Sequence, residues 1–102
     1  MNFFRPENIP DTGCEHFETL HKSGSFTIER IASNALKHGC WYDQDHDEWV
    51  MLMRGRAVIE FEDKEQTALE EGDYLLLEAH RRHRVLETSG DALWLALHLG
   101  PL

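Results

Sequence analysis

The segment AVIEFEDKEQTALEEGDYLLLEA, residues 57–79, decides the fold class of this 102-residue chain. In its first part, the apolar side chains of Ala57, Ile59 and Phe61 alternate with a more polar set that includes Glu60. This period of two is typical of an amphipathic β-strand. A polar turn at residues 71–73 separates QTALEEG from a second apolar run, DYLLLEA. Short strands joined by short turns predict antiparallel pairing.

The same pattern continues on both sides of this segment. Further candidate strands are SFTIERIAS (25–33), CWYDQ (40–44), DEWVMLM (47–53), HRVLETS (83–89) and ALWLALHL (92–99). In the first of these, Phe26 and Ile28 alternate with Thr27 and Glu29, as in a half-buried strand. About eight short strands with no long helical period predict an all-β sandwich or barrel.

The first 24 residues differ in character from the rest. Pro6 and Pro10 discourage regular structure, and the segment Glu15 to Leu20 suggests one short helical turn. We therefore expect an extended or helical lead-in over residues 1–24, which packs on a single β-barrel domain formed by residues 25–102.

The composition excludes several classes of partner. The formal net charge of −9 disfavours nucleic acids and anionic membranes, which are polyanions. The apolar runs are too short to span a bilayer, and the N-terminus lacks the apolar stretch of a secretory signal. We expect a cytoplasmic protein in which Cys14 and Cys40 stay free thiols.

Two candidate strands, DYLLLEA and ALWLALHL, are apolar on both faces over part of their length. One face would fill the barrel, and the other needs a second cover. In a chain of this size, that cover is expected to be another subunit, so the pattern predicts a homodimer.

Two spacings in the chain point to a family. Glu48 precedes Gly55 by six intervening residues, and Gly72 is followed at a matching distance by His83. Both spacings, in this order on an all-β chain, resemble the two sequence motifs of the cupin superfamily, and the resemblance covers residues 25–99. It implies a cupin jelly roll like that of small single-domain bacterial cupins without an assigned reaction. It also carries Glu48 and His83 over as metal ligands.

The chain departs from the family pattern at several positions. Tyr42 and Gln44 stand where the first motif has its two histidines. In the second motif, Glu78 stands at the proline position, His80 at a glycine position and Glu87 at the asparagine position. The three-histidine, one-glutamate metal set that the resemblance implies is therefore incomplete.

His46 is the obvious substitute for a missing nitrogen ligand. If residues 42–48 are extended, Tyr42, Gln44, His46 and Glu48 share one face, because side chains alternate with period two. The predicted metal site then consists of Gln44, His46, Glu48 and His83. Such a mixed nitrogen and oxygen set suits a divalent zinc, manganese, iron(II) or nickel ion, among which the residues do not choose.

Several other polar residues are also candidates for a binding site. Tyr42 and His98 are candidate ligand-binding residues, although a lone histidine on an apolar strand is more often a hydrogen-bonded core residue. The aspartates at 43, 45 and 47 alternate away from Glu48 and are expected to face solvent. The basic cluster Arg81, Arg82 and Arg84 either balances nearby acids or receives an anionic ligand at the barrel mouth.

From the sequence, we expect a small metal-binding cupin with a pocket for a small molecule. The ligands considered for this pocket include anionic ones. A metal-dependent oxygenase or isomerase is one form of this hypothesis. The alternative is a non-catalytic module of the same fold that binds or senses a small ligand. Enzyme and binding module stay open at this point, because one fold hosts many functions.

Overall fold

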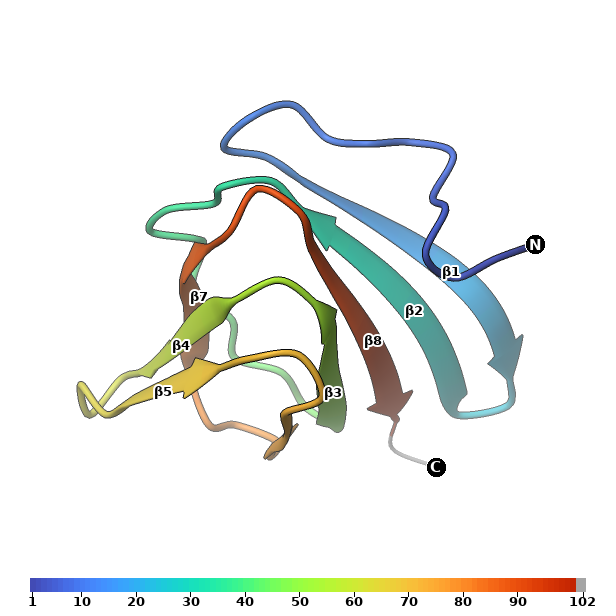
Figure 1. Cartoon of the computed structure of the whole chain (residues 1–102). Coiled ribbons are helices and arrows are strands. Elements are labelled where there is room, and N and C mark those ends of the chain that lie inside the picture. Colours follow the sequence, from blue (N-terminus) through green and yellow to red (C-terminus); the bar gives the residue numbers. More distant parts are fainter. Residues whose placement is uncertain (101–102) are drawn as a thin grey trace.

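The computed structural model describes residues 1–100, and its regular structure is entirely β (Figure 1). The strands are β1 (Glu15–Ser23), β2 (Phe26–Ser33), β3 (Asp47–Arg54), β4 (Ala57–Phe61), β5 (Gln66–Leu69), β6 (Tyr74–Leu77), β7 (His83–Thr88) and β8 (Ala92–Leu99). The predicted all-β fold class is confirmed. Within these residues, no helix is long and apolar enough to cross a membrane.

The strands form two antiparallel sheets that face each other, as in a jelly roll (Figure 1). The larger sheet has the order β1-β2-β8-β3-β6, and the smaller one has the order β5-β4-β7. Side chains from both sheets meet in one hydrophobic core, where Leu52 of β3, Ile59 and Phe61 of β4, and Trp94 of β8 are almost fully buried. On β4, the predicted alternation holds, since Ala57, Ile59 and Phe61 face inward.

β8 lies at the centre of the larger sheet and pairs with both β2 and β3. Ala92, Trp94 and Ala96 are buried on its inner face. Its leucines share the outer face with side chains of β3 and β6. We call this surface the outer apolar face; it comprises Trp49, Met51, Tyr74, Leu76, Leu95 and Leu97.

The N-terminal segment is attached through a buried arginine on β2. The Arg30 guanidinium donates hydrogen bonds to the carbonyl oxygens of Asn2 (3.1 Å) and Phe3 (3.0 Å) and pairs with Glu18 of β1. The division of the chain at residue 24 stays a prediction, but β1 lies within the predicted lead-in and pairs with β2. Cys14, just before β1, and Cys40 are free and exposed.

Three sequence-based expectations for individual segments were wrong. The stretch Glu15–Leu20 is part of β1 and not a helical turn, because pairing along β2 satisfies its backbone groups. The segment CWYDQ is not a strand; only Tyr42 bridges to His83. On β2, Glu29 and Ile31 face the barrel interior, so the apolar pair at 26 and 28 does not mark the inner face.

Gly55 and Gly72 of the two motifs both have a positive φ, 90° and 89°. A Cβ at Gly55 would lie 2.4 Å from Ser89 Oγ and 3.0 Å from Ala92 Cα, whereas a Cβ at Gly72 meets nothing within 4 Å. Both turns therefore favour glycine, but only the turn at Gly55 is also closely packed.

We expect Gly55→Ala to lower the free energy of unfolding more than Gly72→Ala does. The left-handed backbone costs each variant about 1–2 kcal/mol. In Gly55→Ala, the added methyl group also clashes with Ser89 in the turn before β8 and with Ala92 of β8. Urea unfolding of the two variants and the wild type measures the difference. Equal losses would show that the close approach at Gly55 contributes nothing.

Candidate functional site

A cavity of ≈ 80 Å³ lies inside the barrel between the two sheets. Both sheets and the segment before β3 contribute to its wall, which is lined by Glu15, Phe17, Glu29, Ile31, Tyr42, Gln44, Glu48, Val50, Ile59, Leu77, His83, Val85, Trp94 and His98. Space of this size holds several water molecules or a small ligand. Polar groups that converge in a mostly apolar cavity are the usual form of a binding site.

Tyr42 and Gln44 reach this cavity although they lie outside the strands. The backbone of Tyr42 exchanges two hydrogen bonds with His83 of β7, at 2.7 and 3.0 Å. The carbonyl of Gln44 accepts a third hydrogen bond, from the His80 amide at 2.7 Å. These bonds hold residues 42–44 against the smaller sheet, and the Gln44 side chain turns inward. Its Oε1 is buried and has no hydrogen-bond partner.

His83, at the start of β7, is buried and oriented by its own backbone. Its Nδ1 lies 2.9 Å from the carbonyl oxygen of Arg81. Since a carbonyl oxygen only accepts, this contact assigns a hydrogen to Nδ1, and in the corresponding neutral tautomer Nε2 is the acceptor. This arrangement is common for histidines that bind metals, because it fixes both the tautomer and the ring orientation.

Glu48 of β3 is only 6% exposed, and its neighbour across the strand pair is His98 of β8. The nearest basic contact is His98 Nε2, 3.9 Å from Glu48 Oε2. A buried carboxylate is costly without a close partner of opposite charge. The short contact of His98 Nε2 goes instead to Glu29 Oε1, at 3.1 Å.

The surroundings of His98 and Glu15 shift the pKa values of both side chains. The hydrogen bond with Glu29 raises the pKa of His98, against the opposing effect of burial, and the charge of Glu48 adds to the rise. Burial raises the pKa of Glu15, while the hydrogen bond from Ser33 (2.6 Å) lowers it and the charge of Glu48 raises it further. Glu15, Glu29 and Glu48 place three carboxyl groups in the wall of one cavity.

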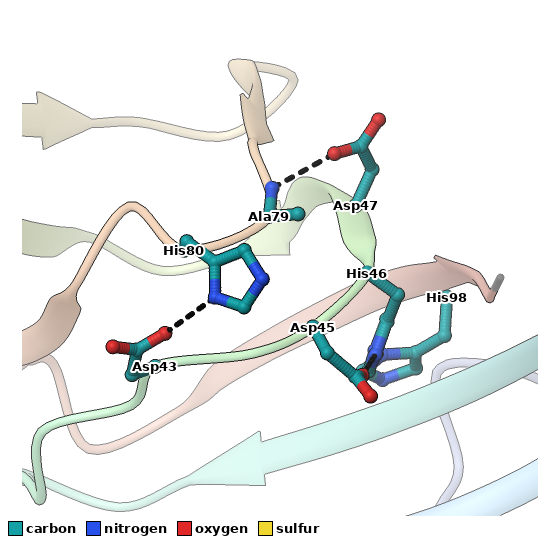
Figure 2. Close-up of polar contacts among 7 residues, drawn as sticks. All are labelled: Asp43, Asp45, His46, Asp47, Ala79, His80 and His98. Carbon is teal, nitrogen blue, oxygen red and sulfur yellow. Dashed lines mark hydrogen bonds and ion pairs between the residues drawn. The ribbon is translucent and has the colours of Figure 1, made fainter.

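His46 does not line the cavity. The backbone bends at residues 45 and 46, so the alternation that aligns Tyr42, Gln44 and Glu48 fails at this residue. Its ring lies between Asp45 and His98, with Nδ1 3.0 Å from Asp45 Oδ1 and Nε2 3.0 Å from His98 Nδ1 (Figure 2). As a metal ligand, His46 stays a prediction.

The three aspartates lie away from the cavity, as their parity predicts. Asp43 contacts Nδ1 of the exposed His80 at 3.1 Å (Figure 2). Asp45 is largely exposed. Asp47 has a structural contact, since its Oδ1 accepts a hydrogen bond from the Ala79 amide at 2.8 Å. This bond ties the loop after β6 to the start of β3.

The basic cluster is neutralised by neighbouring acids. Arg81 pairs with Glu65, Arg82 with Glu62 and Arg84 with Glu60. Arg82 and Arg84 also pack over the ring of Trp41, and Arg81 packs over that of Phe61. None of the three arginines lines the cavity. The contacts favour the interpretation that these arginines balance nearby acids.

Within residues 1–100, no group of three or more His, Cys, Asp or Glu side chains is arranged to hold a metal ion. The three-histidine, one-glutamate shell is therefore not formed by the described residues. The cavity does offer a carboxylate from Glu48, an imidazole nitrogen from His83 and an amide oxygen from Gln44. The buried Gln44 oxygen has no hydrogen-bond partner, and a carboxylate, an imidazole nitrogen and an amide oxygen are all donor types that divalent ions accept.

Comparison with known proteins decides the family. A family model described as the cupin domain matches residues 27–98. The chain belongs to the cupin family. The resemblance seen in the two sequence motifs is thereby confirmed. No protein with a curated function matches this cupin.

Several solved structures resemble this cupin. A protein of Ralstonia eutropha JMP134, provisionally named a mannose-6-phosphate isomerase, is 41% identical, with 99% of this chain and 97% of that chain covered and a TM-score of 0.82. A cupin superfamily protein of Desulfitobacterium hafniense DCB-2 is 21% identical over 90% of this chain and 83% of that chain, with a TM-score of 0.76. KdgF from Halomonas sp. is 16% identical over 100% and 94%, with a TM-score of 0.80. The last two show likeness of fold alone.

Two acidic lining residues were missed from the sequence. Glu15 was assigned to a helical turn and Glu29 to the polar face of β2. For Glu29, the sequence did contain a signal. Ile31 lies two residues further along the same strand, so an apolar side chain shares the face of Glu29, and the structure shows that this face is the inner one.

We expect Glu29→Gln to lower the pKa of His98 toward its ordinary value, because the hydrogen bond with the Glu29 carboxylate is the main cause of the rise. A raised histidine pKa stabilises the fold fully below the unfolded value of about 6.5, and this contribution is lost as pH rises through the folded-state pKa. The variant should lose that pH-dependent contribution.

An NMR titration of the His98 ring and urea unfolding across this pH range measure both effects. Glu70→Gln, a change of the same charge at an exposed position, is the control. An unchanged His98 titration in Glu29→Gln would contradict the assigned cause.

Proposed function

We propose that this cupin binds a divalent cation in its barrel through the Glu48 carboxylate, His83 Nε2 and Gln44 Oε1. The observation that carries the proposal is the buried Gln44 oxygen without a partner, in the same cavity wall as the buried Glu48 and His83. A cation would satisfy the amide oxygen and offset the carboxylate charge. Both groups are otherwise costly to bury.

The donor set points to a hard or borderline ion. Two oxygen donors and one imidazole suit zinc, manganese, iron(II) or nickel, with water or a ligand in the remaining positions. His46 would join as a further ligand only by giving up its 3.0 Å contact with His98. When bound, such an ion supplies Lewis-acid polarisation of a bound oxygen or activation of water.

We propose Tyr42 and His98 as the residues that contact a small molecule beside the ion. The His98–Glu29 pair is able to hold or transfer a proton at His98, since both side chains line the cavity and lie 3.1 Å apart. The provisional name of the 41% identical protein supports chemistry of the isomerase type for this chain.

The second candidate is a binding or sensing module without turnover. It is supported by Tyr42 and Gln44, which stand at the positions of two metal-binding histidines in other cupins and leave fewer imidazole ligands for a catalytic ion. Turnover separates the two candidates: a metal-loaded sample that binds a small molecule and never converts it favours the module.

We expect Glu48→Gln to weaken zinc binding by at least about tenfold, because even outer-shell partners of a metal ligand contribute 10–100-fold to affinity. Isothermal titration calorimetry measures the change. Glu87→Gln on β7 is the control, since it removes one negative charge from an exposed position.

In metal-free protein, Glu48→Gln should leave the free energy of unfolding unchanged or raise it, because it removes a buried charge without a close partner. Zinc affinity equal to that of the wild type in both Glu48→Gln and His83→Ala would exclude this metal site.

We also propose that the outer apolar face joins two copies of the chain. Trp49 lies between Leu76 and Leu97 across the paired strands, and its ring packs 5.7 Å from that of Tyr74. Tyr74 remains 67% exposed and Leu76 42% exposed. Contiguous exposed apolar side chains of this kind favour a protein partner, and two-fold dimers are the commonest assemblies.

Leu76→Glu should convert the dimer to a monomer, because it introduces a charge into the proposed interface. Leu20→Glu on β1 is a matched control, since Leu20 is 41% exposed at the opposite edge of the same sheet. Sedimentation velocity at micromolar concentration measures both variants. A monomeric wild type would rule out the proposed dimer.

A further inference from the structure

His98 of β8 is held at both nitrogens of its ring. Nε2 lies 3.1 Å from Glu29 Oε1, and both side chains line the cavity. Nδ1 lies 3.0 Å from Nε2 of His46, which does not line it. The two histidine rings meet edge to face, with centroids 5.2 Å apart (Figure 2). His98 therefore has one partner in the cavity wall and one partner outside it.

Asp45 fixes the direction of the hydrogen bond between the two histidines. Its Oδ1 lies 3.0 Å from His46 Nδ1. The hydrogen bond with His46 lowers the pKa of Asp45, so this carboxyl group is ionised at neutral pH and only accepts. The contact thus assigns a hydrogen to His46 Nδ1. In the corresponding neutral tautomer, His46 Nε2 accepts the hydrogen of His98 Nδ1.

The two contacts of His46 differ in their exposure to water. The side chain of Asp45 is 77% exposed, whereas those of His46 and His98 are 22% and 20% exposed. Exposed ion pairs contribute little, because water competes for both partners. The bond between the two rings is better shielded, and a hydrogen bond is stronger where water is scarce. The contact of His46 with His98 is therefore the stronger of the two.

The segment that carries His46 is anchored on both sides. The Gln44 carbonyl accepts a hydrogen bond from the loop after β6 at 2.7 Å, and Asp47 Oδ1 accepts one from the same loop at 2.8 Å. Between these two anchors, the backbone bends at residues 45 and 46. The bend that takes His46 out of the cavity thus also fixes its place beside His98.

We propose that His46 is a positioning residue for His98. By accepting the hydrogen of Nδ1, it keeps the other ring nitrogen, Nε2, directed at Glu29 and at a molecule bound in the cavity. The inference rests on the proposed function in one respect, that His98 contacts the bound molecule. It differs from a role as metal ligand, because both ring nitrogens of His46 are engaged, one by Asp45 and one by His98.

His46→Leu and His46→Gln test the proposal as a matched pair in metal-free protein. The two side chains are similar in size, but only glutamine carries an oxygen that accepts a hydrogen bond. In a ¹⁵N-labelled sample, exchange of the His98 Nδ1 hydrogen with water reports on the bond between the rings. Exchange should be roughly tenfold faster in His46→Leu, which corresponds to one hydrogen bond. It should stay near the wild-type rate in His46→Gln.

The ¹⁵N signal of His98 Nε2 reports on the positioning itself, because this nitrogen contacts Glu29. It should shift in His46→Leu and stay in place in His46→Gln. His80→Ala is the control, since it removes a similar contact, between His80 and Asp43 at 3.1 Å, in which His98 takes no part. His80→Ala should change neither the exchange rate nor the Nε2 signal.

The proposal is overturned if His98 Nδ1 carries no hydrogen in the wild type, or if the leucine and glutamine variants behave alike. If His46→Leu does not fold, the hydrogen on Nδ1 in the wild type and its exchange rate in His46→Gln decide.

Zinc calorimetry keeps this test separate from the proposed metal site. Zinc affinity in His46→Leu should equal that of the wild type. A loss as large as that in Glu48→Gln would make His46 a metal ligand and overturn its positioning role. A wild type that binds no zinc but gives the expected NMR results would overturn the metal site and leave the positioning role intact.

Discussion

The pairing of β3 with β8 is the constraint on which the site depends. It places Glu48 opposite His98, Val50 opposite Ala96 and Leu52 opposite Trp94. Side chains alternate with period two, so a slip of one residue would move each of these groups to the outer face. The apolar pairs specify the register, because only one register buries Leu52 with Trp94, and the same register brings the two ionisable groups into the barrel.

Sequence patterns predicted the strands whose apolar side chains alternate cleanly, as at Ala57, Ile59 and Phe61 of β4. They failed where the amino acids on the inner face are themselves polar. On β2, the inner position is Glu29 and an outer one is Ile28, so hydrophobicity indicated the wrong face. β1 was missed for a related reason: its inner face begins with Glu15, and its stability comes from pairing with β2.

Part of the cavity wall was predicted from the sequence, whereas metal or ligand binding by these residues stays a prediction. Parity correctly placed Tyr42, Gln44 and Glu48 around one cavity, because residues 42–44 are held extended by backbone bonds to β7. It failed for His46, since a bend at residues 45 and 46 turns that side chain toward His98. A bend of this kind depends on contacts with a distant strand, which period alone does not encode.

The buried acids of the barrel bear on function through their cost. Glu48 is almost fully buried, and its carboxylate lies 3.9 Å from the nearest basic group, His98. Burial also raises the pKa of Glu15. Replacing buried ionic groups by apolar ones of similar volume is often neutral or favourable for stability, so packing alone gives no reason for an acid at either position. A fold that had only to pack would therefore gain nothing from these acids. The burial of Glu48 in the same cavity wall as the unpartnered Gln44 oxygen agrees with the cation proposed there, which would offset the charge and satisfy the oxygen.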